Sequence, residues 1–174
     1  MRQLYFSVVL FLLLALEGIA LELLPSPFVN SSFMFVPHWI YIFLLFIVLF
    51  YDNELTSYSI IYGIVFGLLI DIVYTEVLGV YMFAYPLSLF VVKELKKFFH
   101  TTIYITILLG IIGLAITDTA IQTVYFAIGI ADSSWNYYFI NRLLPTIIGN
   151  GFFLLFLNPI LKNRLLKWQD DGRQ

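Results

Sequence analysis

Apolar stretches separated by short polar segments run along the whole chain. Most of them approach the roughly 20 residues that a helix needs to cross the hydrocarbon core of a bilayer. They are interrupted at Pro, Ser, Asn and charged residues, which commonly end helices. The pattern predicts six helices at about residues 3–24, 33–51, 58–74, 77–92, 101–131 and 143–161.

Several boundaries carry further expectations. The first stretch follows Arg2 and could be a signal peptide, but it is longer than a signal and lacks a clear cleavage site, which favours a retained helix. Residues 25–32 are rich in Pro and Ser and predict a loop. The helices at 58–74 and 77–92 are joined by almost nothing, so we expect a tight antiparallel pair.

The two longest segments are less regular. Thr117-Asp118-Thr119 and Gln122 are expected to interrupt the helix at 101–131. Residues 132–141, with Trp135, are expected to form a loop with interfacial aromatic side chains.

Composition fixes the class of protein. With 61% hydrophobic and 11% charged residues and a mean hydropathy of +0.95, the chain is an integral membrane protein with one transmembrane domain over residues 1–174. The absence of cysteine excludes disulfides and thiolate sites. A basic soluble face for nucleic acid is also missing.

The basic residues orient the predicted bundle. Eight of the nine Lys and Arg residues lie at Arg2, at 93–97 and at 162–173. Placing these segments in the cytoplasm satisfies the positive-inside rule and leaves only Arg142 outside. We therefore expect a multi-pass protein with both termini in the cytoplasm.

The most informative motif is Gly63-x-x-x-Gly67-x-x-x-Asp71, followed by Glu76 and Gly79. At this spacing the two glycines and the aspartate share one helix face, where small residues allow a second backbone to approach closely. That face either packs within the bundle or receives a partner, and internal packing is the simpler interpretation. Asp71 is a functional candidate because a carboxylate in a transmembrane helix must face protein or water.

Helix geometry predicts a polar region in the outer half of the bundle. At about 1.5 Å per residue, five acids fall at that depth, with Arg142 as the nearby cation. They either line a wet vestibule with structural hydrogen bonds or form an outward-open pocket in which Arg142 anchors an anionic group. The candidate residues for this region and its packing are Glu17, Glu22, Gly63, Gly67, Asp71, Glu76, Gly79, Asp118, Arg142, Pro145 and Asn150.

Catalytic motifs are missing from the sequence. It contains no H-E-x-x-H, no G-x-S-x-G and no Gly-rich phosphate loop. Asp71 and Asp118 invite comparison with paired-aspartate proteases, but the glycine-flanked signature is not present. We therefore expect no enzyme activity, no cofactor and no metal.

Two motifs resemble the hallmarks of the bacterial rod shape-determining protein MreD family. The first is Gly-x-x-x-Gly-Leu-Leu-Ile-Asp at 63–71 with Leu-Gly at 78–79, and the second is Arg-Leu-Leu-Pro-Thr-Ile-Ile-Gly-Asn at 142–150. The total length, Val36-Pro37 and the short basic tail are also similar. His38 and the acid-rich loop after the second helix do not match the family pattern.

The resemblance implies a non-enzymatic scaffold subunit of the cell-elongation (rod) complex in the bacterial plasma membrane. Such a subunit binds MreC and helps position peptidoglycan synthases for cell-shape control. The resemblance also implies RodA, a class B penicillin-binding protein and the actin-like MreB as possible partners, besides membrane lipids.

The family is also similar to the S components of energy-coupling-factor vitamin transporters, which implies an all-α bundle of about six transmembrane helices. This likeness suggests a second hypothesis, in which an outward-facing polar cavity binds a small solute or a lipid-linked ligand. Short loops and the absence of an ATP motif favour the scaffold, since a transporter would need a separate motor.

Overall fold

The computed structural model describes residues 2–23, 34–99, 102–132 and 134–171, together with their side chains except those of residues 21–23. Within these ranges every regular element is helical. The elements are α1 (Arg2–Leu23), α3 (Trp39–Phe50), α4 (Tyr58–Tyr74), α5 (Val80–Lys96), α6 (Ile103–Ala127), α7 (Trp135–Tyr138), the π-helical turn η1 (Phe139–Leu143) and α8 (Leu144–Asp170). The predicted loop at 25–32 lies outside the described residues.

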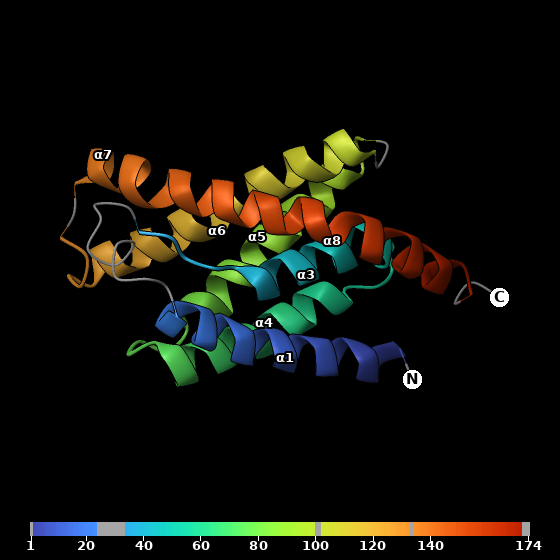
Figure 1. The fold of residues 1–174 in the computed structure, drawn as a ribbon, viewed down its shortest axis with the longest axis horizontal. Helices are drawn as coiled ribbons and strands as arrows, with labels where there is room; N and C mark the ends of the chain where they lie inside the picture. Colours follow the sequence, from blue (N-terminus) through green and yellow to red (C-terminus); the bar gives the residue numbers. More distant parts are fainter. Residues whose placement is uncertain (1, 24–33, 100–101, 133, 172–174) are drawn as a thin grey trace.

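The short helix α3 is the centre of the fold. It contacts α1, α4, α5, α6 and α8, and Figure 1 shows it between α8 on one side and α4 with α1 on the other. Every residue from Ile40 to Phe50 is buried. At about 1.5 Å per residue α3 is roughly 18 Å long, well short of the roughly 30 Å hydrocarbon core. It is therefore an internal helix surrounded by longer ones.

The predicted helix at 33–51 starts too early. Residues 34–38 are not helical, and α3 begins at Trp39. Pro37 explains part of the difference, because a proline disfavours the helical conformation of the residue before it. The predicted helix included Met34, Phe35 and Val36 only because these residues are apolar.

The two helices joined by a short turn are found as an antiparallel pair. The prediction of a helix over 58–74 is confirmed by α4. The next helix begins at Val80 instead of residue 77, because Gly79 takes the left-handed conformation with φ of 97° just before it. It also continues beyond the predicted end at residue 92 to Lys96, so that Lys93 and Lys96 lie in its last turn.

The two longest segments are more regular than expected. The predicted interruption near Thr117–Thr119 and Gln122 is wrong, since α6 is continuous from Ile103 to Ala127. The predicted loop over 132–141 is also wrong beyond Ser134, because helical structure starts at Trp135 and continues through η1 into α8. The last helix extends beyond residue 161 to Asp170.

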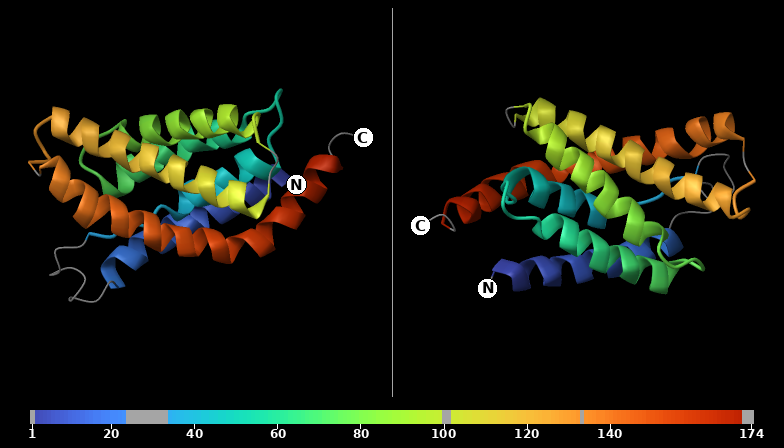
Figure 2. Two further views of the ribbon diagram at one scale, coloured as in Figure 1. Left: turned by 90° about the horizontal axis from the view of Figure 1, so that it is seen from above. Right: turned by 180° about the vertical axis from the view of Figure 1, so that it is seen from behind.

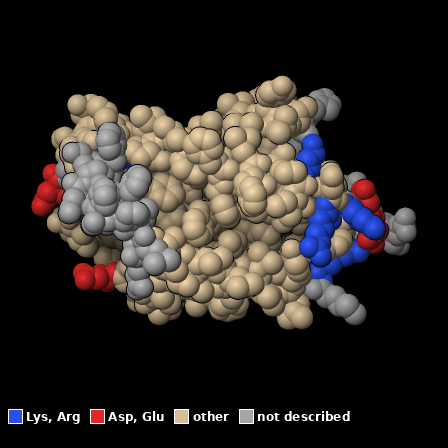
Figure 3. Space-filling view, in the orientation of Figure 1, with Lys and Arg blue, Asp and Glu red and all other residues tan. Residues whose placement is uncertain are grey.

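Three helical stretches among the described residues are long and apolar enough to cross a membrane: Arg2–Ala20, Ile103–Ala127 and Trp135–Asp170. The N- and C-terminal ends lie at the same end of the bundle (Figures 1 and 2). Figure 3 shows Lys and Arg side chains gathered at that end. The charge asymmetry of the sequence is therefore also an asymmetry of the folded bundle.

Candidate functional site

The Gly63/Gly67 face of α4 is filled by α5. A Cβ atom added to Gly67 would lie 2.6 Å from the carbonyl oxygen of Tyr81 and 2.8 Å from the backbone nitrogen and Cα of Met82. A Cβ added to Gly63 would lie 3.0 Å from a methyl group of Leu89. The two glycines thus allow α4 and α5 to pack closely, and their groove is internal.

Asp71 binds the start of α5. Its side chain is fully buried, and its oxygens accept hydrogen bonds from the backbone N–H groups of Gly79 (2.9 Å), Tyr81 (3.0 Å) and Met82 (3.1 Å). The first N–H groups of a helix have no partner within the helix and favour a negative charge. The motif from Gly67 to Gly79 therefore closes the α4–α5 pair, while Glu76 in the turn is exposed.

Two other acids bind helix starts in the same way. The Glu17 carboxylate of α1 is buried and accepts a hydrogen bond from the backbone N–H of Ile40 (2.8 Å), in the first turn of α3. Asp52 accepts hydrogen bonds from the backbone N–H groups of Tyr58 (3.1 Å) and Ser59 (3.0 Å), in the first turn of α4. Asp52 is not among the residues predicted from the sequence, although an acid shortly before an apolar run is a signal of a helix start.

Asp52 lies outside the apolar helices, in the turn between α3 and α4. Burial raises the pKa of its carboxyl above the ordinary value, and the hydrogen bonds from Ser59 and the charge of Lys93 act against that shift. The carboxyl is thus tied to the first turn of α4 at considerable desolvation cost.

The extended segment before α3 is held by α8. The backbone N–H of Val36 donates to the Thr146 hydroxyl (3.2 Å), and the N–H of His38 donates to the side-chain oxygen of Asn150 (2.8 Å). The Asn150 amide in turn donates to the carbonyl oxygen of Val36 (2.8 Å). Non-helical backbone at membrane depth requires such partners. Pro145 lies in the first turn of α8, directly after the π-helical turn η1.

Asp118 is the centre of a polar cluster between α6 and η1. Its carboxylate is fully buried and lies 3.3 Å from Nη2 of Arg142. Tyr138 donates its hydroxyl hydrogen to the other carboxylate oxygen (2.8 Å). Arg142 also donates to the side-chain oxygen of Gln122 (3.3 Å). The pairing of Asp118 with Arg142 explains why a charged residue does not interrupt α6.

His38 completes this cluster and was set aside by the sequence analysis. It is fully buried, with Nε2 3.5 Å from Asp118 Oδ1 and Nδ1 3.2 Å from the Tyr85 hydroxyl. Neither Nε2 of His38 nor Nε of Arg142 has a hydrogen-bond partner. A histidine directly after the family-like Val36-Pro37 pair was the signal available in the sequence.

The predicted candidates take different partners within the bundle. Asp118 is paired with Arg142, Asn150 holds the segment before α3, and Glu17 and Asp71 bind two different helix starts. His38 connects two of these sites, because its N–H donates to Asn150 and its ring lies beside Asp118. The side chain of Glu22 lies outside the described residues. Among the described residues, no three His, Asp or Glu side chains are grouped as metal ligands.

Replacing Arg142 by Ala is expected to lower the free energy of unfolding by roughly 2 kcal/mol, because Asp118 would lose a charge-assisted hydrogen bond in a buried position. Adding Asp118→Asn to Arg142→Ala should recover part of the loss, since the uncompensated charge is removed. Melting temperatures of the detergent-solubilised variants measure both effects. A double variant no more stable than Arg142→Ala would show that the pair is not the cause.

The fold and these contacts define an all-helical integral membrane protein in which polar groups are used to hold short helices and an extended segment inside the bundle. The chain matches the family model of the rod shape-determining protein MreD over residues 1–167, and it belongs to the MreD family. The resemblance seen at 63–79 and 142–150 is therefore confirmed.

A curated relative agrees with this assignment. The rod shape-determining protein MreD of Bacillus subtilis (strain 168) is 27% identical over 150 residues, which cover 86% of this chain and 86% of the relative. No solved structure matches the chain significantly. Family membership gives the chain a role in rod-shape determination within the membrane.

Proposed function

We propose that this protein is a non-enzymatic scaffold of the cell-elongation complex that binds MreC and helps position the peptidoglycan synthases. The observation that carries the proposal is the match to the MreD family over residues 1–167. RodA, a class B penicillin-binding protein and MreB are proposed as further partners in the same complex.

The use of polar groups supports a scaffold. Glu17, Asp52 and Asp71 are bound to helix starts, and Asp118 is bound to Arg142. Large apolar side chains are exposed on several helices, for example Phe11 on α1, Phe83 on α5 and Phe152 on α8. Contact with partners would therefore be made mainly by helix faces within the bilayer, where close packing drives association.

The second candidate is an S-component-like protein that binds a small solute or a lipid-linked ligand. It is favoured by the short internal helix α3, which starts after an extended segment, since transporters build binding sites at such broken helices. The polar groups beside that segment are His38 and the Asp118–Arg142 pair.

We further propose that both termini face the cytoplasm, because the basic side chains of α5 and α8 then lie on the cytoplasmic side. Single cysteines that replace Lys97 or Ser134 test this orientation with a membrane-impermeant thiol reagent applied to intact cells. Position 134 should be labelled and position 97 should not. Labelling at position 97 would contradict it.

The functional test is affinity purification in mild detergent after co-expression with MreC from the same organism. We expect MreC to co-purify with the wild-type protein, and depletion of the protein to round the cells. A stoichiometric small molecule without MreC would favour the second candidate. Gly67→Ala, expected to destabilise the α4–α5 pair, tests whether capture of MreC requires that pair.

A further inference from the structure

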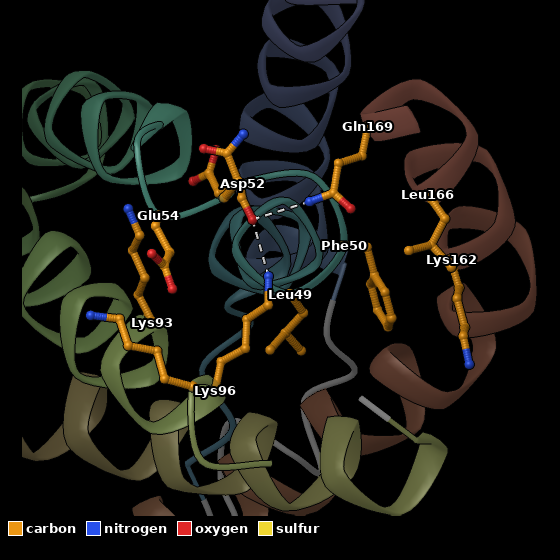
Figure 4. Close-up of a pocket in the computed structure, with 11 residues that line it drawn as sticks. Leu49, Phe50, Asp52, Glu54, Lys93, Lys96, Lys162, Leu166 and Gln169 are labelled. Carbon is orange, nitrogen blue, oxygen red and sulfur yellow. Dashed lines mark hydrogen bonds between the residues drawn. The ribbon is translucent and has the colours of Figure 1, made fainter. Parts of the chain in front are cut away.

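A basic pocket lies at the end of the bundle where both chain ends are found. Its volume is about 350 Å³, and it lies between the last turn of α5, the α3–α4 turn and the C-terminal part of α8. Figure 4 shows Lys93 and Lys96 on one side of the pocket and Lys162 on the opposite side, with Leu49 and Phe50 between them.

The charges lining this basic pocket are predominantly positive. Lys97 is paired with Glu94, with 2.7 Å between Nζ and Oε1. The remaining lysines, Lys93, Lys96 and Lys162, contribute three positive charges, against two negative charges from Asp52 and Glu54. The Asp52 carboxylate is bound to the first turn of α4. Its negative charge is therefore already used within the protein, and the pocket favours an anion.

Part of the basic lining is fixed in place by the fold. Lys96 donates to the carbonyl oxygens of Val48 (2.9 Å) and Asp52 (3.0 Å), and Lys93 donates to the carbonyl oxygen of Thr56 (2.6 Å). Because these bonds go to backbone at the end of α3 and in the following turn, the ammonium groups are held beside the pocket. Lys162 lies over the ring of Phe50, with its Nζ 5.8 Å from the ring centroid.

We propose that the basic pocket binds the phosphate-containing headgroup of an anionic phospholipid, with Lys162 and the lysines of α5 on opposite sides of the headgroup. Lysine binds phosphate as a compact positive charge. A volume of about 350 Å³ is near the lower limit of ligand pockets, which suits a headgroup better than a whole lipid.

The surroundings favour a lipid over free phosphate. Leu49, Phe50 and Leu166 supply apolar lining beside the lysines, which suits the glycerol and upper acyl carbons of a phospholipid. Basic pockets between transmembrane helices are known to take anionic lipid headgroups. The inference requires only that the chain lies in a membrane, and so it does not depend on MreC binding.

The test titrates the purified protein in neutral detergent with phosphatidylglycerol, phosphatidylcholine or inorganic phosphate, at constant ionic strength, and follows the melting temperature. Phosphatidylglycerol is expected to raise it, while phosphatidylcholine and inorganic phosphate should leave it nearly unchanged. Lys162→Gln should weaken the apparent affinity for phosphatidylglycerol about fivefold. Lys162→Arg, which keeps the charge, should retain most of the affinity.

The matched control is Lys167→Gln, which removes the same charge from an exposed position of α8 that does not line the pocket. It should bind phosphatidylglycerol like the wild type. Equal losses in Lys162→Gln and Lys167→Gln would overturn the proposal in favour of diffuse surface charge. Equal stabilisation by phosphatidylcholine or by inorganic phosphate would overturn it as well.

Discussion

Gly67→Ala is expected to lower the free energy of unfolding by about 3 kcal/mol, because overfilling a well-packed interior typically costs 1–3 kcal/mol and the neighbours here are backbone atoms. The new methyl group would lie 2.6 Å from the Tyr81 carbonyl oxygen and 2.8 Å from Met82 Cα. Backbone atoms at a helix start cannot rotate away as a side chain does, so α4 and α5 would have to separate. For a protein of this size the melting temperature should fall by about 6–12 °C.

Two other glycines provide matched controls. At Gly63 the added methyl group meets a methyl group of Leu89 at 3.0 Å, a contact that a side-chain rotation can relieve. At Gly151 nothing lies within 4 Å of the added atom, so alanine should be neutral or slightly stabilising through its helix propensity. The expected order of stability is therefore Gly151→Ala, Gly63→Ala, Gly67→Ala. A Gly67→Ala variant as stable as Gly151→Ala would show that α4 and α5 are not in close contact.

The α4–α5 pair could be predicted well from the sequence because its signals are local. The spacing of Gly63, Gly67 and Asp71 defines one face of a helix. Because the connection is short, the next helix must pack antiparallel against the first. The local sequence does not decide whether the Gly63/Gly67 face packs within the bundle or binds a partner. This depends on where the backbone of Tyr81 and Met82 lies, which is a tertiary property.

The late start of α3 could not be predicted, because two sequence signals at residues 34–38 oppose each other. Residues 34–38 are mostly apolar and extend the hydrophobic run, whereas Pro37 opposes a helix just there. The extended conformation is supported by Thr146 and Asn150, more than a hundred residues away in sequence. The sequence of residues 34–38 itself does not indicate that these partners lie on α8.

The same limitation explains why the partners of the acids could not be predicted. Helix geometry gave the approximate depth of Glu17 and Asp71, and depth alone suggested that they meet. Their partners are the N–H groups at the starts of α3 and α5, and the predicted starts near residues 33 and 77 were several residues too early. Once the helix starts are known, the role of each acid follows. It accepts hydrogen bonds from the first N–H groups of the nearby helix, because unpaired N–H groups buried in a membrane protein are costly.

The capping role of Asp71 leads to the largest effect expected for a single polar side chain. Asp71→Leu would remove the acceptor for the N–H groups of Gly79, Tyr81 and Met82 and leave these donors without a partner in the protein interior. Hydrogen bonds to charged groups contribute about 1.5–3 kcal/mol each, and the losses are not fully additive. We expect a loss of about 4 kcal/mol or more in the free energy of unfolding, seen as reduced folded yield and a lower melting temperature.

Asp71→Asn should be less damaging, at about 2 kcal/mol, because the amide keeps one oxygen acceptor but places an N–H₂ group against backbone donors. Glu76→Gln is the control: it removes a carboxylate charge five residues later at an exposed position, where substitutions usually change stability by less than about 0.5 kcal/mol. We therefore expect the stability of the variants to fall in the order Glu76→Gln, Asp71→Asn, Asp71→Leu. This order is expected if the Asp71 side chain caps α5, and not if its buried charge has no structural role. If the leucine variant were the most stable of the three, the carboxylate would contact lipid and the cap would not form; if asparagine and leucine were equally harmful, the negative charge itself would hold the start of α5.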